Sequence, residues 1–177
     1  RSGAAVTVGK GGVLSVHRVN FCVTQENCTW RPSPAEAASI RRGLADDPSD
    51  TWRLSADIAL YYYQTDHEVW AGLLQDLLWE ASDEADSGVW QFASAWGLVQ
   101  SGPHLPDDFR LHVDRLLLGI GRRLAARPLA ADDPLGRGAS SRALGLIRLD
   151  DHFGRLYGRR PFEGQVASCV EAFTRRD

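Results

Sequence analysis

The stretch DHEVWAGLLQDLLWEA, residues 66–81, decides the fold class. Its apolar side chains recur at intervals of three and four residues, which predicts an α-helix with one buried face: Val69, Trp70, Leu73, Leu74, Leu77, Leu78 and Ala81. A carboxylate at the first position can accept a free backbone N–H, so we expect Asp66 to cap this helix. We expect the helix to continue to about Ala85, beyond the quoted stretch.

The same apolar spacing extends in both directions from this helix. Capping residues, prolines and glycines punctuate the chain and predict six further helices, at about 34–44, 50–64, 86–101, 106–127, 140–154 or 158, and from 161 onward. Asp86-Ser87 is the predicted cap of the helix that begins near residue 86. The connections between these helices are short, which favours antiparallel neighbours.

The first 23 or so residues differ from the rest of the chain. Two β-prone runs, Ala5–Val8 and Val13–Val16, flank Gly9-Lys10-Gly11-Gly12, and glycine readily adopts the positive φ of a tight turn. We therefore predict a β-hairpin, whose second strand could extend to Val23. A phosphate-binding loop is the alternative for these glycines, but the GxxxxGK[ST] pattern is absent.

These signals predict a mainly α protein with a short N-terminal β-hairpin. We expect one helical domain over residues 1–177, in which residues 1–30 form the hairpin or extended segment. About seven helices form either an irregular bundle or HEAT-like stacked pairs. No motif shared between residues 50–85 and 86–127 supports the second arrangement beyond the apolar spacing, so the bundle is preferred.

Composition limits the class of protein. The chain is 44% hydrophobic and 24% charged, which is typical of a globular protein, and its net charge of −3 argues against broad nucleic-acid binding. No apolar run reaches the roughly 20 residues of a membrane span, so we expect a cytoplasmic protein. Lys10 is the only lysine among 20 basic residues, which indicates a GC-rich bacterial source. Cys22, Cys28 and Cys169 fit no zinc pattern and are expected to be thiols.

Aromatic residues are concentrated between Trp52 and Trp96. Tyr61, Tyr62 and Tyr63 are consecutive, and because helical residues are spaced 100° apart they cannot all face one core. Trp79 lies among polar residues at helical spacing: Gly72, Gln75, Asp76 and Asp83. It is either an exposed binding residue or covered by an adjacent segment such as the hairpin.

Acidic residues follow Trp79. Glu80, Asp83, Glu84 and Asp86 make an acidic face where the third helix ends, and this face would repel DNA and attract a basic partner. A solvated surface without a partner is the alternative interpretation.

Two histidine–carboxylate clusters are candidates for chemistry. Asp66-His67-Glu68 and Asp150-Asp151-His152 would supply two imidazoles and several carboxylates if the fold brought them together. HExxH is absent, and helix capping already accounts for the first cluster. We therefore expect no metal and no cofactor, and keep a small enzyme or metal-binding protein using His67, Glu68, Asp151 and His152 as an alternative.

Two basic segments are candidates for anion contacts. Arg137, Ser140 and Arg142 lie in a small-residue loop entering a helix, where free N–H groups can bind an anion. Arg155, Arg159 and Arg160 surround Phe153 and Tyr157, but no RNA-binding motif accompanies this patch.

The functional hypothesis is a non-catalytic protein-interaction module, such as a bacterial immunity or regulatory protein that masks a basic partner. Its binding residues would be Tyr61, Tyr62, Tyr63, Trp79, Glu80, Asp83 and Glu84. No nucleophile elbow or dinucleotide fingerprint favours an enzyme. A third hypothesis is an aromatic-lined pocket for an apolar small ligand.

Overall fold

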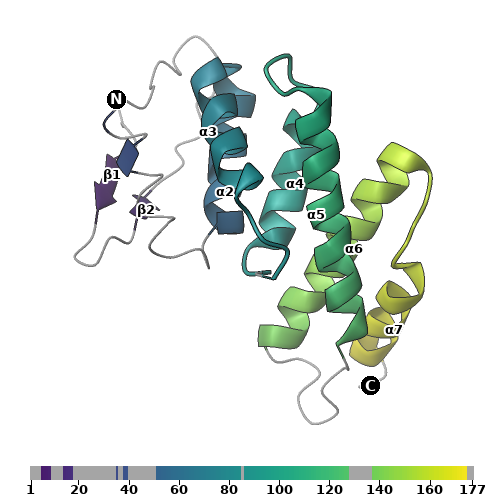
Figure 1. Ribbon diagram of the computed structural model, residues 1–177. Helices are drawn as coiled ribbons and strands as arrows, with labels where there is room; N and C mark the ends of the chain where they lie inside the picture. Colours follow the sequence, from purple (N-terminus) through teal and green to yellow (C-terminus); the bar gives the residue numbers. More distant parts are fainter. Residues whose placement is uncertain are drawn as a thin grey trace.

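The computed structural model describes residues 5–8, 14–17, 35, 38–39, 51–84, 86–127 and 137–174. The regular secondary structure of the last three ranges is entirely helical and confirms the predicted all-α class for this part of the chain (Figure 1). It comprises α2 (Thr51–Thr65), α3 (Glu68–Trp79), α4 (Val89–Val99), α5 (Asp107–Ala126), α6 (Arg137–Tyr157) and α7 (Glu163–Thr174). Among the described residues, no helix combines the length and the hydropathy needed to cross a membrane.

Two short strands precede the helices. β1 (Ala5–Val8) and β2 (Leu14–His17) pair antiparallel, with Ala5 opposite His17 and Val8 opposite Leu14. The predicted extension to Val23, the turn at residues 9–12 and the state of Cys22 and Cys28 lie outside the described residues.

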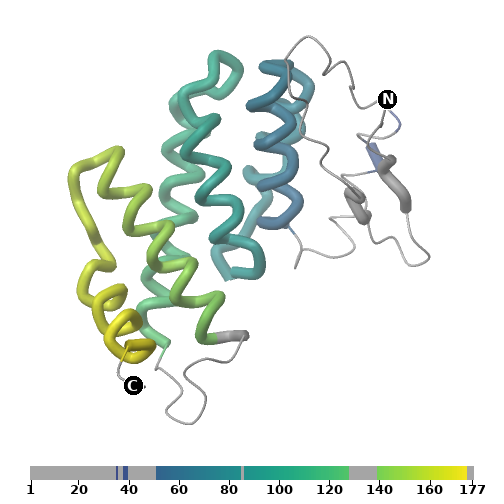
Figure 2. Tube along the Cα trace, turned by 180° about the vertical axis from the view of Figure 1, so that it is seen from behind, coloured from purple at the N-terminus to yellow at the C-terminus, as the bar shows by residue number. Residues whose placement is uncertain are grey.

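The helices follow one another across the molecule in chain order, from α2 and α3 to α6 and α7 (Figures 1 and 2). Helices α2, α4 and α6 pack against one another in succession and form one layer. Helix α3 packs on α2 and α5, and α5 packs on α6. Helix α7 packs on α6 at the end of the series.

The core contains the side chains that the apolar spacing selects. Trp52, Trp70 and Trp96 are buried, and the Phe92 ring lies 5.3 Å from that of Trp52 and 5.8 Å from that of Trp96. These rings join α2 to α4. Burying four large aromatic side chains contributes several kcal/mol, since each removes about 150–250 Å² from water.

The limits of α3 differ from the prediction at both ends. His67, not Asp66, is the N-cap: its Nδ1 accepts a hydrogen bond from the Val69 N–H at 3.2 Å. Asp66 occupies the turn from α2 with a φ of 47°, a conformation that Asp tolerates better than most residues. The helix ends at Trp79 rather than near Ala85, because the polar residues that follow form local bonds such as the Glu84 N–H to the Ser82 hydroxyl, at 3.0 Å.

The start of α4 is also different from the prediction. Gly88 is the N-cap, with a φ of 81° and no side-chain cap, whereas the Asp86 carboxylate pairs with Arg127 at 2.6 Å. A Cβ on Gly88 would lie 2.7 Å from the backbone nitrogen of Arg53. The close approach of α2 and the positive φ therefore both require glycine at this position.

Helix α6 ends next to a glycine. Helix α6 begins three residues before the expected Ser140 and ends at Tyr157, where Gly158 has a φ of 64° and donates its N–H to the Gly154 carbonyl.

The predicted helix over residues 34–44 lies outside the described residues, apart from Ala35, Ala38 and Ser39, which are helical.

Candidate functional site

Asp114 is a carboxylate in the interior of the helical stack. It follows the core residue Val113 on α5, and only 7% of its surface is exposed. Its Oδ1 accepts hydrogen bonds from Trp96 Nε1 at 3.2 Å and from His152 Nε2 at 2.9 Å. Its Oδ2 accepts one from the Tyr157 hydroxyl. Three helices, α4, α5 and α6, thus meet at one carboxylate.

The hydrogen bonds keep this carboxylate charged. Burial by itself would raise the pKa of Asp114, but the hydrogen bonds from His152 and Tyr157 outweigh burial and hold the pKa below its usual value. Burial and the bond to the Asp114 carboxylate raise the pKa of the Tyr157 hydroxyl to about 12. Asp114 is therefore a buried negative charge, and Trp96, His152 and Tyr157 each donate a hydrogen bond to it.

The three residues of the cluster Asp150-Asp151-His152 have separate partners, because they project from α6 at 100° intervals. Asp150 accepts the Phe162 N–H at 2.8 Å and so fixes the turn that leads into α7. Asp151 pairs with Arg155 at 3.0 Å, and His152 binds Asp114. The cluster therefore does not converge on one ligand.

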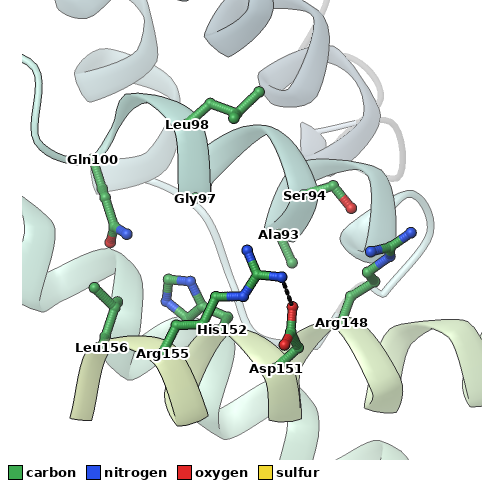
Figure 3. Close-up of a pocket in the computed structure, with 10 residues that line it drawn as sticks. All are labelled: Ala93, Ser94, Gly97, Leu98, Gln100, Arg148, Asp151, His152, Arg155 and Leu156. Atoms are coloured by element: carbon green, nitrogen blue, oxygen red, sulfur yellow. Dashed lines mark ion pairs between the residues drawn. The ribbon is translucent and has the colours of Figure 1, made fainter. Parts of the chain in front are cut away.

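A small hollow of about 150 Å³ lies between α4 and α6 (Figure 3). Ala93 and Gly97 leave room on the α4 side, while His152 and the Asp151–Arg155 ion pair come from α6 (Figure 3). Its volume is below the roughly 300–1,000 Å³ of ordinary ligand pockets. It can hold water or a small ion rather than an organic ligand.

A larger hollow, the α5–α6 groove, lies against the other side of the Asp114 cluster and has a volume of about 510 Å³. Its apolar surface comes from α5, α6 and the turn before α7: Leu111, Leu118, Phe153, Tyr157 and Pro161. Three arginines also line it: Arg115, Arg122 and Arg159. Asp114 is the one carboxylate among the residues that line this groove.

Trp79 is 45% exposed at the end of α3. Its ring stacks on that of His112, with centroids 4.4 Å apart and an angle of 28°, and lies 5.7 Å from the Phe109 ring. His112 is held in turn by a 2.9 Å hydrogen bond between its Nε2 and the Leu78 carbonyl. Helix α5 therefore covers one side of Trp79 and leaves the other side open.

Three exposed carboxylates follow Trp79 in the loop after α3: Glu80, Asp83 and Glu84. None of them forms an ion pair with a basic side chain among the described residues, whereas Asp86 is occupied by Arg127. Asp83 lies against α5, where a Cβ on Gly119 would come within 2.4 Å of its Oδ2. We call Trp79, Glu80, Asp83 and Glu84 the Trp79 surface.

Two of the three consecutive tyrosines belong to the core rather than to a surface. Tyr61 is buried and stacks on Trp70 with centroids 4.8 Å apart, and Tyr62 is buried with its hydroxyl accepting the His104 N–H at 3.2 Å. Tyr63 is 56% exposed. This corrects the sequence-based grouping, in which all three tyrosines were candidate binding residues. Helical geometry required at least one exposed member of the run, and only Tyr63 is available to a partner.

The first histidine–carboxylate cluster is distant in the fold from the second. His67 caps α3 and Glu68 is exposed in its first turn, while His152 is on α6, and α4 and α5 lie between these two helices (Figure 1). Among the residues that the structure describes, no three His, Cys, Asp or Glu side chains are placed to hold a metal ion. The geometry therefore offers no observation in favour of a shared site.

The candidate anion-binding residues belong to the first turns of α6. Arg142 donates from its Nε to the Leu124 carbonyl at 2.7 Å, which satisfies a carbonyl in the last turn of α5. Ser140 is partly buried, and Arg137 begins the helix. Arg142 thus has a structural partner, and the side chain of Arg137 lies outside the part of the chain that the structure describes.

Comparisons of the chain with protein-family models, with curated proteins and with solved structures find no match.

The α5–α6 groove was not predicted from the sequence, although a signal for it exists. Leu111, Arg115, Leu118 and Arg122 repeat at spacings of four, three and four and define one face of α5 beside its core face. Apolar residues that alternate with arginine on a non-core face indicate a partly apolar surface. A second signal is the position of Asp114, an acidic residue directly after the core residue Val113.

Proposed function

We propose that this protein is a non-catalytic interaction module that binds a basic protein partner through the Trp79 surface, as an immunity or regulatory protein would. The observation that carries the proposal is the half-exposed Trp79 ring, held against His112 at 4.4 Å beside carboxylates that form no ion pair with any described residue. A bacterial, cytoplasmic setting is part of the proposal and rests on composition.

The rigidity of Trp79 supports a role in binding. Contacts with Phe109 and His112, and the bond from His112 to the Leu78 carbonyl, restrict the ring before any partner arrives. A pre-ordered aromatic side chain loses little conformational entropy on association, and tryptophan is enriched among residues that dominate binding energies. Solvent exposure of such a ring costs free energy that a partner would recover.

Charge supports the chemistry of the partner. Glu80, Asp83 and Glu84 are exposed and form no ion pair among the described residues. A partner with lysine or arginine around an apolar contact would match this arrangement and would associate faster at low ionic strength.

We also propose that the six helices are stacked in a HEAT-like manner rather than as an irregular bundle, with α3, α5 and α7 packed along the layer of α2, α4 and α6. The succession of α2, α4 and α6 in one layer supports this arrangement. Stacked helix pairs present long continuous faces, which proteins of this architecture use to bind other proteins.

The test is affinity capture from the native host with quantitative mass spectrometry. Two variants alter the surface, Trp79→Ala and Glu80→Lys with Glu84→Lys. Two matched controls make the same changes elsewhere, Leu98→Ala, an exposed apolar residue on α4, and Glu68→Lys with Glu163→Lys. We expect a basic protein that is retained by the wild type and both controls and lost from both surface variants. Equal capture of every protein by all five chains would contradict the proposal.

A further inference from the structure

One face of α5 lines the α5–α6 groove with alternating apolar and basic side chains. Leu111 and Leu118 lie two turns apart, as do Arg115 and Arg122, and a separation of seven residues corresponds to about 10 Å along the helix. The neighbouring face of α5 carries His112, which stacks on Trp79, and Gly119, against which Asp83 lies, so the groove adjoins the Trp79 surface. The residues that line the groove include none of the Trp79 surface.

The arginines of the groove have no carboxylate partner in the part of the chain that the structure describes. Arg115, Arg122 and Arg159 are exposed and form no ion pair or hydrogen bond among the described residues. Other arginines of the stack are paired with carboxylates: Arg110 with Asp107, Arg127 with Asp86, Arg155 with Asp151 and Arg160 with Asp150. The groove thus contains three positive charges that no carboxylate of the described residues neutralises.

The floor of the groove is apolar and aromatic. Phe153 is buried at its base, and the Tyr157 ring is 53% exposed while its hydroxyl is directed to Asp114. All three bonds to Asp114 are made by protein groups, so its oxygens are occupied. The negative charge under the floor would repel an anion at the base, which leaves the arginine rim as the favourable place for one.

We propose that the α5–α6 groove binds a small organic anion with an apolar body, of the class of a medium-chain carboxylate. The carboxylate pairs with Arg115 and Arg122 at the rim, and the hydrocarbon lies on Leu118 and Phe153. The volume of about 510 Å³ lies within the roughly 300–1,000 Å³ range of small-ligand sites. Charge complementarity selects an anion, and the apolar floor selects a ligand with a hydrophobic body over inorganic phosphate or acetate.

The experiment measures decanoate binding to the full chain by calorimetry and by ¹H–¹⁵N chemical-shift mapping. Decanol, which has the apolar body without the charge, and acetate, which has the charge without the body, are the matched ligands. We expect saturable decanoate binding with shifts confined to residues 111–122 and 153–161, about tenfold weaker binding of decanol, and no detectable binding of acetate.

Variants separate the two parts of the site. Arg115→Ala with Arg122→Ala should weaken decanoate binding about tenfold and leave decanol binding unchanged. Leu118→Asn should weaken both ligands. The control, Arg148→Ala with Arg155→Ala, removes two arginines that line the small hollow between α4 and α6, and should change neither. Urea unfolding of each variant confirms that the fold is retained.

Three outcomes would overturn the proposal: decanoate binding that the first double variant leaves intact, equal affinity for decanol and decanoate, or shifts outside the groove. A peptide that alternates Glu and Leu is the competing macromolecular ligand. If it displaced decanoate and bound more than about tenfold more tightly, the groove would be a peptide site and the small-molecule assignment would be wrong.

Discussion

The Asp114 carboxylate supports the strongest prediction about stability. Replacing it by alanine removes the acceptor of two buried donors, Trp96 Nε1 and His152 Nε2. A buried donor left without a partner costs about 1–3 kcal/mol, and two such donors cost about 4 kcal/mol together. The Tyr157 hydroxyl can turn to water, because its side chain is half exposed, and adds little. Loss of the desolvation cost of the carboxylate offsets part of this sum, so we expect Asp114→Ala to lower the free energy of unfolding by about 2–4 kcal/mol.

Urea unfolding followed by tryptophan fluorescence and by circular dichroism measures this loss, provided the m-value is unchanged. Asp107→Ala is the matched control, since Asp107 is in the first turn of the same helix and its side chain is 95% exposed, and it should cost less than about 1 kcal/mol. Asp114→Ala combined with Tyr157→Phe should cost no more than Asp114→Ala by itself, within about 0.5 kcal/mol, because the hydroxyl has already lost its partner.

The lowered pKa of Asp114 also makes the free energy of unfolding depend on pH. A carboxyl whose pKa is lower in the folded than in the unfolded state stabilises the fold above its unfolded pKa of about 3.9, and this contribution disappears as the pH falls through the folded value. The stability difference between wild type and Asp114→Asn should therefore be constant near neutral pH and decrease below about pH 4. A cost of Asp114→Ala no larger than that of Asp107→Ala would refute the reasoning.

The remaining predictions concern a glycine pair and a tyrosine. Gly88→Ala should lower the free energy of unfolding by about 2 kcal/mol or more, since φ is 81° and the added Cβ would lie 2.7 Å from the Arg53 nitrogen. Gly97→Ala should raise the free energy of unfolding by about 0.5–1 kcal/mol, because no atom of a neighbouring described residue lies within 4 Å of the added Cβ. Thermal unfolding of both variants distinguishes these opposite signs. Because the pKa of Tyr157 is raised to about 12, its contribution to stability is complete below the ordinary tyrosine pKa of 10.0 and is lost as the pH rises through the folded value. Spectrophotometric titration should show this ionisation near pH 12 in the wild type and not in Tyr157→Phe. If the ionisation missing from the variant lay near pH 10 instead, the bond to Asp114 would be absent in solution.

How far the sequence predicts the helices can be judged from α3. Seven apolar positions at helical spacing identified the helix and its buried face, because amphipathic periodicity is a local property. Its ends were wrong, since His67 competes with Asp66 as the cap and the end at Trp79 depends on bonds in the following loop and on contacts with α5. Caps are chosen among neighbouring candidates by tertiary contacts that periodicity does not contain.

The candidate site likewise contains some residues that local sequence patterns indicate and others that only the tertiary structure brings together. Trp79 and the acidic residues after it could be proposed as a surface from the sequence, because an aromatic residue among polar positions is a local anomaly. The Asp114 cluster was not, since its partners His152 and Tyr157 are 38 and 43 residues away in the chain. Tyr61, Tyr62 and Tyr63 could be assigned only as a group, and their separation into two core residues and one exposed residue required the positions of Trp70 and His104.

The sequence by itself determined the all-α class, the approximate position of each helix between residues 51 and 174 and most of its buried face. These properties follow from the spacing of apolar residues within about ten residues of chain. Tertiary structure decided which arginines have no carboxylate partner among the described residues, which carboxylate is buried, and where the hollows lie. Those properties depend on pairs of atoms brought together by packing of α4, α5 and α6, and no local pattern specifies which helices will be neighbours.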